Sequence, residues 1–303
     1  MKIIVIGTIF VDIKGFPLGA FIPNGRNIGY IQQVHGGVGR NVAEDLTCFG
    51  IHPTFVSLVD ENGTGDEILK HLESVGVCTD HVGRSPNGMG TWLAIFNAEG
   101  DVASSISVRS ELNPLCDLLD RDAESIFSDA DSIILELDID REAADKVFYY
   151  AQKYHCPVYS LISNMTVAAG RTDQLAASEC FICNEQEAGQ LFGIDLNGFS
   201  EDQLRDILRK ESQKRSIKSM IITLGSRGAL FCDPQGDTGL CPPEKVDVVD
   251  TTGAGDAFCA GASAALTAGL DFEEACRYGS RLAASVITVK SNVSPLKVEK
   301  SLF

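Results

Sequence analysis

The residues Asp250-Thr251-Thr252-Gly253-Ala254-Gly255-Asp256 stand directly before a run of small residues at 257–268. The two glycines around Ala254 allow a tight turn that exposes backbone N–H groups. The small residues predict a closely packed helix, whose N-terminus attracts anions through its free N–H groups and its dipole. Asp256 falls in the first turn of that helix, where it can accept a proton from a hydroxyl that attacks a bound phosphate. Taken by itself, Asp256 is equally well explained as a favourable acid at a helix start.

The rest of the chain alternates between apolar β-rich runs and helical patterns. Continuous apolar strands separated by helices predict an α/β fold, with a doubly wound, largely parallel sheet and helices on both of its faces. Such sheets bind ligands at the carboxyl ends of their strands. The expected strands are 2–7, 53–59, 132–137, 157–161, 180–183 and 219–223, and the expected helices are 41–50, 65–76, 141–154, 185–192, 201–210 and 255–269.

Three further motifs precede residues 250–256. They are Gly36-Gly37-Val38-Gly39-Arg40-Asn41-Val42-Ala43-Glu44, then Asn184-Glu185-Gln186-Glu187, then Thr223-Leu224-Gly225-Ser226-Arg227-Gly228. In this order the four stretches resemble the signatures of the ribokinase-like (PfkB) family of sugar and nucleoside kinases. The resemblance extends from about residue 7 to residue 294, nearly the whole chain.

The resemblance implies phosphoryl transfer from ATP with Mg²⁺ as cofactor. Asp256 would be the catalytic base, and the backbone of Gly253, Ala254 and Gly255 would form the anion hole. Phosphoryl transfer needs this kind of cradle, a metal and a base for the hydroxyl. The nucleotide would contact Asn184, Thr223, Gly225 and Gly228, and Glu187 would hold Mg²⁺ through water. The pair Asn184 and Glu187 also fits an ordinary capping box at a helix start.

The acceptor site implied by the resemblance consists of Asp12, Gly36, Gly37 and Asn41. A carboxylate and an amide can together fix a vicinal diol, because one accepts and the other both donates and accepts hydrogen bonds. The alternatives are that Asp12 is a turn residue and that Asn41 is a helix N-cap.

A monovalent cation, K⁺ in many relatives, would bind the backbone carbonyls of Asp250 and Thr252. The other half of that site would come from Lys290-Ser291-Asn292-Val293-Ser294. This loop lacks the glycine of the ribokinase loop, so the sequence leaves potassium dependence open.

Two stretches interrupt the alternation of strands and helices. Residues 13–35 carry turn signals, and residues 88–110 predict a hairpin around the turn Asn97-Ala98-Glu99-Gly100-Asp101. The resemblance implies that both form a small β-sheet lid on a single kinase domain of residues 1–303. On a strand, Trp92 and Phe96 share one face and Ile95 points to the other. One face would cover the acceptor and the other would pack against a second copy, which predicts a homodimer.

Composition excludes several classes of protein. The net charge of −17 disfavours binding to nucleic acid or to an anionic membrane surface, and no apolar run reaches the length of a membrane span. Ten scattered cysteines without a secretion signal predict reduced thiols in a cytoplasmic protein. Cys180 and Cys183 would point to opposite faces of a strand, which disfavours a metal site. The sequence has no Walker motif, and Phe258 replaces the third glycine of a dinucleotide fold.

The acceptor is predicted to be a pentose or a ribonucleoside, with pseudouridine preferred. The stretch Val38-Gly39-Arg40-Asn41 looks most like that of pseudouridine kinases. The alternatives are a ribokinase- or fructokinase-type sugar kinase, or a binding protein of the same fold without catalysis. Intact Asp256 and Gly253-Ala254-Gly255 disfavour the non-catalytic protein.

Overall fold

The large sheet of the molecule is mostly parallel, as the sequence predicts. The structure is a computed structural model that describes residues 1–97, 102–164 and 170–296. Its strands run in the order β13-β12-β11-β10-β9-β8-β1-β4-β5, and all pairs are parallel except those of β12 with its two neighbours. The strands are β1 Ile3–Ile6, β4 Thr54–Asp60, β5 Cys78–Ser85, β8 Ser132–Glu136, β9 Val158–Leu161, β10 Cys180–Asn184, β11 Met220–Thr223, β12 Ala229–Cys232 and β13 Thr238–Cys241.

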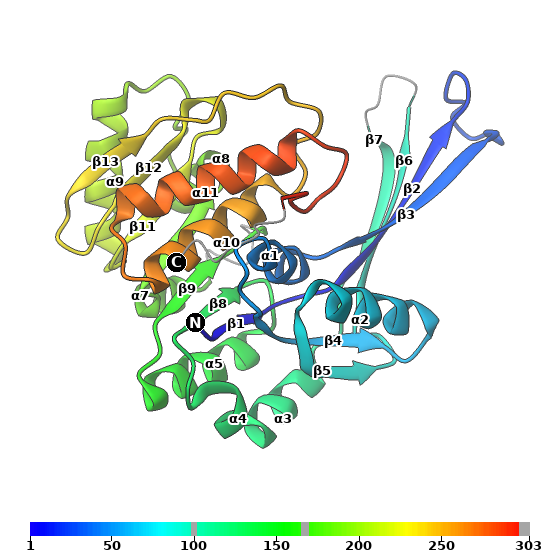
Figure 1. Ribbon diagram of the computed structural model, residues 1–303. Helices are drawn as coiled ribbons and strands as arrows, with labels where there is room; N and C mark the ends of the chain where they lie inside the picture. Colours follow the sequence, from blue (N-terminus) through cyan, green and yellow to red (C-terminus); the bar gives the residue numbers. More distant parts are fainter. Residues whose placement is uncertain (98–101, 165–169, 297–303) are drawn as a thin grey trace.

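Helices cover both faces of this sheet (Figure 1). One face packs against α1 Val38–Thr47, α2 Gly63–Val75, α10 Ala254–Thr267 and α11 Phe272–Ile287. The other packs against α3 Asn113–Arg121, α4 Ala123–Phe127, α5 Arg141–Tyr154, α7 Thr172–Ala177, α8 Glu185–Phe192 and α9 Glu201–Arg215. Within the described ranges, no helix combines the length and the apolar character needed to cross a bilayer.

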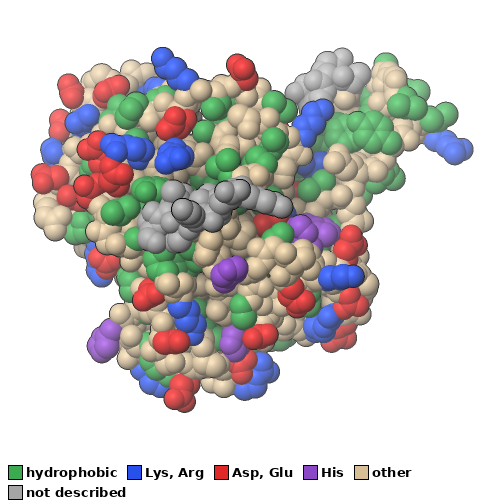
Figure 2. Space-filling model, in the orientation of Figure 1, with side chains coloured by type: hydrophobic (Ala, Val, Ile, Leu, Met, Phe, Trp, Pro, Cys, Tyr) green, Lys and Arg blue, Asp and Glu red, His purple; other side chains and the backbone are tan. Residues whose placement is uncertain are grey.

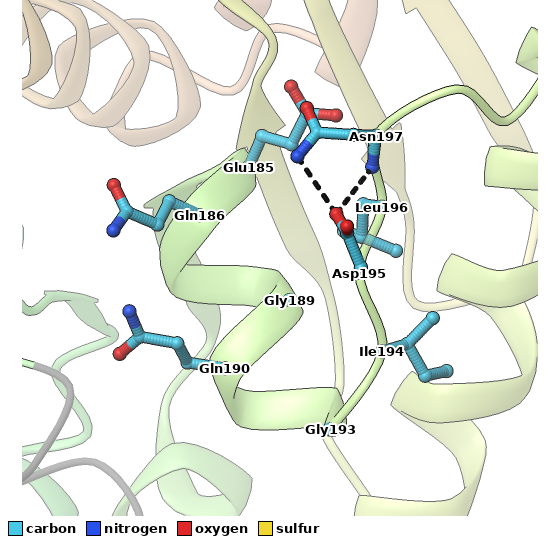
Figure 3. Close-up of a pocket in the computed structure, with 9 residues that line it drawn as sticks. All are labelled: Glu185, Gln186, Gly189, Gln190, Gly193, Ile194, Asp195, Leu196 and Asn197. Atoms are coloured by element: carbon cyan, nitrogen blue, oxygen red, sulfur yellow. Dashed lines mark hydrogen bonds between the residues drawn. The ribbon is translucent and has the colours of Figure 1, made fainter.

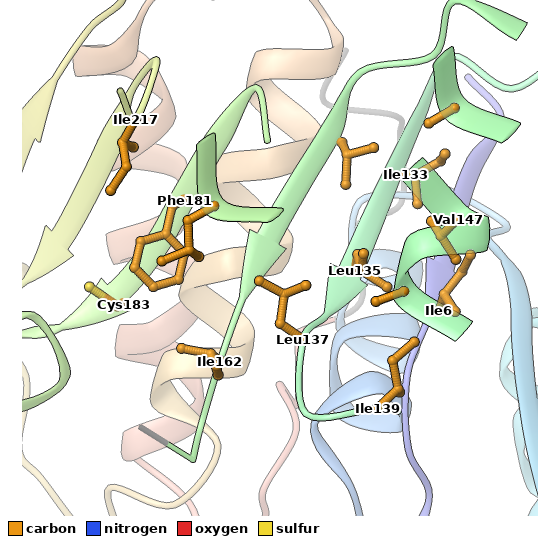
Figure 4. Close-up of a cluster of buried hydrophobic side chains, with 14 of the residues drawn as sticks. Ile6, Ile133, Leu135, Leu137, Ile139, Val147, Ile162, Phe181, Cys183 and Ile217 are labelled. Atoms are coloured by element: carbon orange, nitrogen blue, oxygen red, sulfur yellow. The ribbon is translucent and has the colours of Figure 1, made fainter. Parts of the chain in front are cut away.

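Strand side chains alternate between two hydrophobic cores, one on each face. Ile6 of β1 and Phe181 of β10 lie in the core on the α5 side (Figure 4), whereas Val5 lies in the core on the α10 side. The same alternation places Cys180 and Cys183 in different cores, so the predicted separation of the two thiols is confirmed.

A second, four-stranded sheet projects from one side of the body (Figure 1). Its order is β3-β2-β6-β7, formed by β2 Phe10–Pro17, β3 Gly29–Gly36, β6 Gly90–Phe96 and β7 Val102–Val108. Strands β6 and β7 pair antiparallel, so the predicted hairpin strands are present. Residues 98–101 of the predicted turn lie outside the described residues.

The observed elements differ from the prediction in two respects. Helix α1 begins at Val38 rather than at residue 41, and α9 continues to Arg215 rather than ending at 210. The strands β5, β12 and β13 and the helices α3, α4, α7 and α11 were not predicted. Strand β5 is an edge strand in which polar residues interrupt the apolar run, so it lacks the continuous pattern of the central strands.

Candidate active site

A cavity of about 380 Å³ lies where the small sheet meets the carboxyl ends of β1 and β8. Strand order reverses between β1 and β8, because the chain adds β4 and β5 on one side and β9 to β11 on the other. Ligands of doubly wound sheets bind at such a switch point. The predicted site residues that line the cavity are Asp12, Gly36, Gly37, Asn41, Thr252, Gly253 and Asp256.

Asp256 is half-buried in the first turn of α10, the position that the sequence predicts. Asn41 Nδ2 donates a hydrogen bond of 2.7 Å to Asp256 Oδ2. Burial raises the pKa of Asp256 to about 7, against the lowering effects of the Asn41 hydrogen bond and the Arg40 charge. The carboxyl group is therefore poised to exchange a proton near neutral pH.

A smaller cavity, of about 70 Å³, also borders Asp256. It is lined by Asn184, Glu187, Thr223 and Gly255 from the predicted nucleotide and metal site, and it shares Asp256 with the larger cavity. The fold thus brings the predicted base between two spaces, one lined by the acceptor motif and one by the nucleotide motifs.

The turn before α10 requires glycine at position 253. Gly253 has φ 82°, in the left-handed region, and a Cβ there would lie 2.1 Å from the backbone oxygen of Asn292. The loop at 290–294 therefore packs directly against the predicted anion loop. Asp250 Oδ1 braces the same turn by accepting from Thr252 N at 2.9 Å and Thr252 Oγ1 at 2.8 Å, and the backbone hydrogen bond lowers the pKa of Asp250.

The acceptor residues are held by the small sheet and by α1. Asp12 lies within β2 with its carboxylate against Gly36, where a Cβ would be 3.0 Å from Oδ2. Burial raises the pKa of Asp12, and the charges of Lys14 and Arg40 oppose that shift. The alternative that Asp12 is a turn residue is therefore wrong, because the residue is part of a strand.

Asn41 is not a helix cap either. Gly37 occupies the N-cap position of α1, so Asn41 lies one turn inside the helix. Its side chain is buried, and Asn41 Oδ1 has no hydrogen-bond partner among the described residues. Asn41 lines the larger cavity, and a buried acceptor without a partner calls for one, such as a water or a ligand hydroxyl.

Asn184 and Glu187 form a complete capping box at the start of α8. Glu187 N donates to Asn184 Oδ1, and Asn184 N donates to Glu187 Oε2, both at 2.8 Å. Burial raises the pKa of Glu187 to about 7, and the charge of Asp138 adds to the shift. The carboxylates of Glu187 and Asp256 both line the smaller cavity and offer the oxygen ligands that Mg²⁺ prefers, so these residues fit the predicted metal. Cap and ligand are compatible roles, because the cap uses one carboxylate oxygen.

The other residues predicted to bind the nucleotide lie on or just after β11, the strand beside Asn184. Thr223 pairs directly with Asn184 across β11 and β10. Gly225 begins a short 3-10 turn, Gly225–Arg227, and Gly228 caps it; both glycines have positive φ. Neither glycine lines the two cavities described above.

Sequence reasoning missed Glu136, a buried acid at the end of β8. Glu136 Oε2 accepts from the backbone N–H groups of Thr8 at 2.7 Å and Gly39 at 3.0 Å, and burial raises its pKa. It lines the larger cavity and ties β1 to the start of α1. An acid inside the apolar run at 132–137 was the available signal.

Several further residues of the larger cavity were also missed as site residues. Trp92 faces it from the small sheet, and Arg109, Asp138, Asp140 and Asn164 line it from the loops. A separate open groove of about 510 Å³ runs along α8 beside Ile194 and Asp195 (Figure 3). That groove contains none of the predicted site residues.

A doubly wound sheet with an acid that borders two cavities at a helix N-terminus has the arrangement that phosphoryl transfer needs. Residues 1–298 match the pfkB family carbohydrate kinases, and the chain belongs to this family. It is accordingly a phosphotransferase that acts on an alcohol group.

Proteins similar to this chain align with nearly its full length. The chain is 32% identical to a guanosine-inosine kinase of Exiguobacterium acetylicum, with 96% of each chain covered. It is 24% identical to a pseudouridine kinase of Escherichia coli, with 97% of this chain and 92% of the relative covered. The structure of Arabidopsis thaliana ribokinase complexed with ribose and ATP has the same fold, with a TM-score of 0.82, 23% identity, and 96% and 93% coverage.

Proposed function

We propose that the chain is an ATP-dependent kinase that phosphorylates the hydroxymethyl group of a ribonucleoside. Asp256 lines both the larger cavity, with the acceptor motif, and the smaller cavity, with Asn184, Glu187 and Thr223, and this position carries the proposal. Mg²⁺ held by Glu187 through water would neutralise phosphate charge when bound. The cytoplasm, where ATP is available and thiols stay reduced, is the proposed compartment.

The residues of the chain have distinct roles in this reaction. Asp12 and Asn41 orient the sugar diol, so that the hydroxymethyl oxygen approaches Asp256. Asp256 takes the hydroxyl proton, and the Asn41 hydrogen bond holds the carboxylate in place for it. The backbone of Gly253, Ala254 and Gly255 stabilises the charge of the transferring phosphoryl group.

The size of the acceptor cavity favours a nucleoside over a free pentose. At about 30 Å³ per water, 380 Å³ corresponds to about a dozen waters. A ribonucleoside adds a base to the pentose, and the base can occupy space that the sugar alone would leave to water. Trp92 lines the same space and offers a ring on which a base can stack, an interaction worth about 1–3 kcal/mol.

Among nucleosides, we place guanosine and inosine first and pseudouridine second. The preference for pseudouridine rests on a short motif, whereas the guanosine-inosine kinase is the more similar of the two relatives over the whole chain. The test is ADP release from Mg·ATP with guanosine, inosine, adenosine, pseudouridine, ribose and fructose. The expected result is a kcat/KM for at least one ribonucleoside more than tenfold above that for ribose. Equal or better use of ribose would refute the nucleoside assignment, and no turnover with any acceptor would refute the kinase.

We further propose a homodimer joined through the outer face of the small sheet. The strand register places Leu93, Ile106 and Val108 on the face opposite Trp92, and Ile31 joins them. These four side chains are exposed, and hydrophobic atoms gather over this sheet in Figure 2. Exposed apolar patches of this kind mark protein contacts. Sedimentation should show a dimer, and Ile106→Asp should give a monomer; a monomeric wild-type protein would refute the proposal.

A further inference from the structure

Arg40 is a buried cation within the acceptor motif. Its side chain is only 3% exposed. Nη1 donates to Glu44 Oε2 at 2.8 Å, and Nε lies 3.5 Å from the carbonyl oxygen of Gly36. Nη2 donates both to the carbonyl oxygen of His35 and, at 3.3 Å, to Asn292 Oδ1. The guanidinium therefore joins the end of β3, the helix α1 and a loop that lies 252 positions away in the sequence.

Asn292 completes a closed triangle with Arg40 and His35. Asn292 Nδ2 donates to the carbonyl oxygen of His35 at 2.8 Å, the same oxygen that Arg40 binds. The backbone of Asn292 lies against Gly253, where it leaves no room for a Cβ. Arg40 thus ties these contacts to Gly36 in the acceptor motif, and Asn292 ties them to Gly253 in the predicted anion loop.

An arginine suits this position better than any other cation. Its planar group donates in several fixed directions, so that it can hold two carbonyl groups, a carboxylate and an amide together. A buried charge is costly unless it is paired and hydrogen-bonded. Glu44 supplies that pairing, and it accepts from His71 on its other oxygen. Arg40 also lowers the pKa of both Asp12 and Asp256, which places its charge near both halves of the site.

We propose that Arg40 and Asn292 act as a positioning pair that couples the acceptor turn, Gly36–Gly37, to the phosphate loop, Gly253–Gly255. The pair fixes the distance between the two substrates, so that binding of one favours productive binding of the other. This inference rests on the proposed kinase function for its catalytic consequence but not for its structural one. Neither side chain needs to touch a reacting atom.

The test compares Arg40→Lys, Asn292→Ala and the double variant. Lysine keeps the charge of Arg40 but loses the planar set of guanidinium N–H donors. Asn292→Ala removes the side-chain amide of the second residue of the pair, at a partly exposed position. Arg84→Lys, which alters an exposed ion pair with Asp66, is the matched control. Hydrogen exchange of the ligand-free proteins reports on the triangle itself. Titrations with inosine and with the non-hydrolysable analogue Mg·AMP-PNP, each with and without the other, report on coupling.

Either single variant should speed exchange at both 36–41 and 250–256. Each ligand alone should bind within about threefold of wild type, whereas kcat should fall at least tenfold, because misplacement by about 1 Å can cost a hundredfold in rate. The kcat of the double variant should be no more than about twofold below that of the more impaired single variant, since both substitutions break the same contact between Arg40 and Asn292. Arg84→Lys should behave as wild type.

Two results would overturn the inference. One is faster exchange in only one of the two stretches, which would show that the pair joins nothing. The other is losses in kcat that multiply in the double variant. If Arg40→Lys fails to fold, Asn292→Ala decides alone, by its exchange pattern and its split between kcat and ligand affinity. A wild-type protein without kinase activity would refute the proposed function, while the exchange result would still stand for or against the pair.

Discussion

Replacing Asp256 by asparagine should separate activity from stability. Asparagine has the same shape, and its Oδ1 can still accept the hydrogen bond from Asn41 Nδ2, now 2.7 Å long. The variant loses only the ability to take a proton. Removal of a general base costs about 10²–10⁴-fold in rate, so kcat should fall by that factor while both substrates still bind.

The same substitution should stabilise the protein at alkaline pH. The pKa of Asp256 is about 7 in the folded protein, because burial disfavours the charged form, against an ordinary value of 3.8. The folded state therefore holds this proton more tightly than the unfolded state. The contribution of Asp256 to the free energy of unfolding therefore falls as the pH rises from about 4 to about 7, and it falls no further above that range. At about 1.4 kcal/mol per pH unit, the difference amounts to about 4 kcal/mol, which asparagine avoids.

The assay combines ADP release with urea unfolding at pH 5 and pH 8. Wild-type kcat/KM should rise with pH through about 7 as Asp256 ionises. The gain in the free energy of unfolding of Asp256→Asn should be larger at pH 8 than at pH 5. Asp80→Asn, at an exposed acid of β5, should change neither quantity. Turnover within threefold of wild type would refute the base assignment, and an equal gain at both pH values would refute the electrostatic argument.

Three further outcomes follow from the geometry of the site. Asp12→Ala should weaken acceptor binding by roughly 1.5–3 kcal/mol for each charge-assisted hydrogen bond lost, with ATP affinity unchanged; equal losses for both ligands in calorimetry would make Asp12 structural. Gly253→Ala should cost about 1–3 kcal/mol in the free energy of unfolding and most of the activity, because the new Cβ meets backbone at φ 82°; wild-type unfolding and turnover would contradict this. Acceptor binding should slow hydrogen exchange across 13–35 and 88–110 if these stretches close as a lid; unchanged exchange at saturating acceptor would exclude closure.

Sequence predicted those parts of the site that depend on local pattern. The glycine spacing before α10 placed Asp256 in a first helical turn, and alternation along β6 placed Trp92 on the face opposite Ile95. Both results need only the geometry of one element. The strand ends were predictable for the same reason, so Asn184 and Thr223 were expected at one edge of the sheet.

The remainder depends on contacts between distant segments. No local pattern indicates that Arg40 meets Asn292, because the two residues are 252 positions apart and the loop resembles no fixed motif. The start of α1 was misplaced because Gly37, a poor predictor of a helix start without a capping side chain, is the N-cap. Tertiary packing decides both features.

The site also has to reconcile two electrostatic demands of the proposed reaction. The proposed base and the proposed metal ligand are carboxylates, yet the phosphates of ATP that would lie beside them are anionic. Burial raises the pKa of Asp256 and of Glu187 to about 7. Near neutral pH each carboxyl group is therefore partly protonated, which reduces its repulsion of the phosphates. Arg40 limits this shift for Asp256, and without its charge the base would stay protonated at a higher pH. The guanidinium of the proposed positioning pair therefore also favours ionisation of the proposed base.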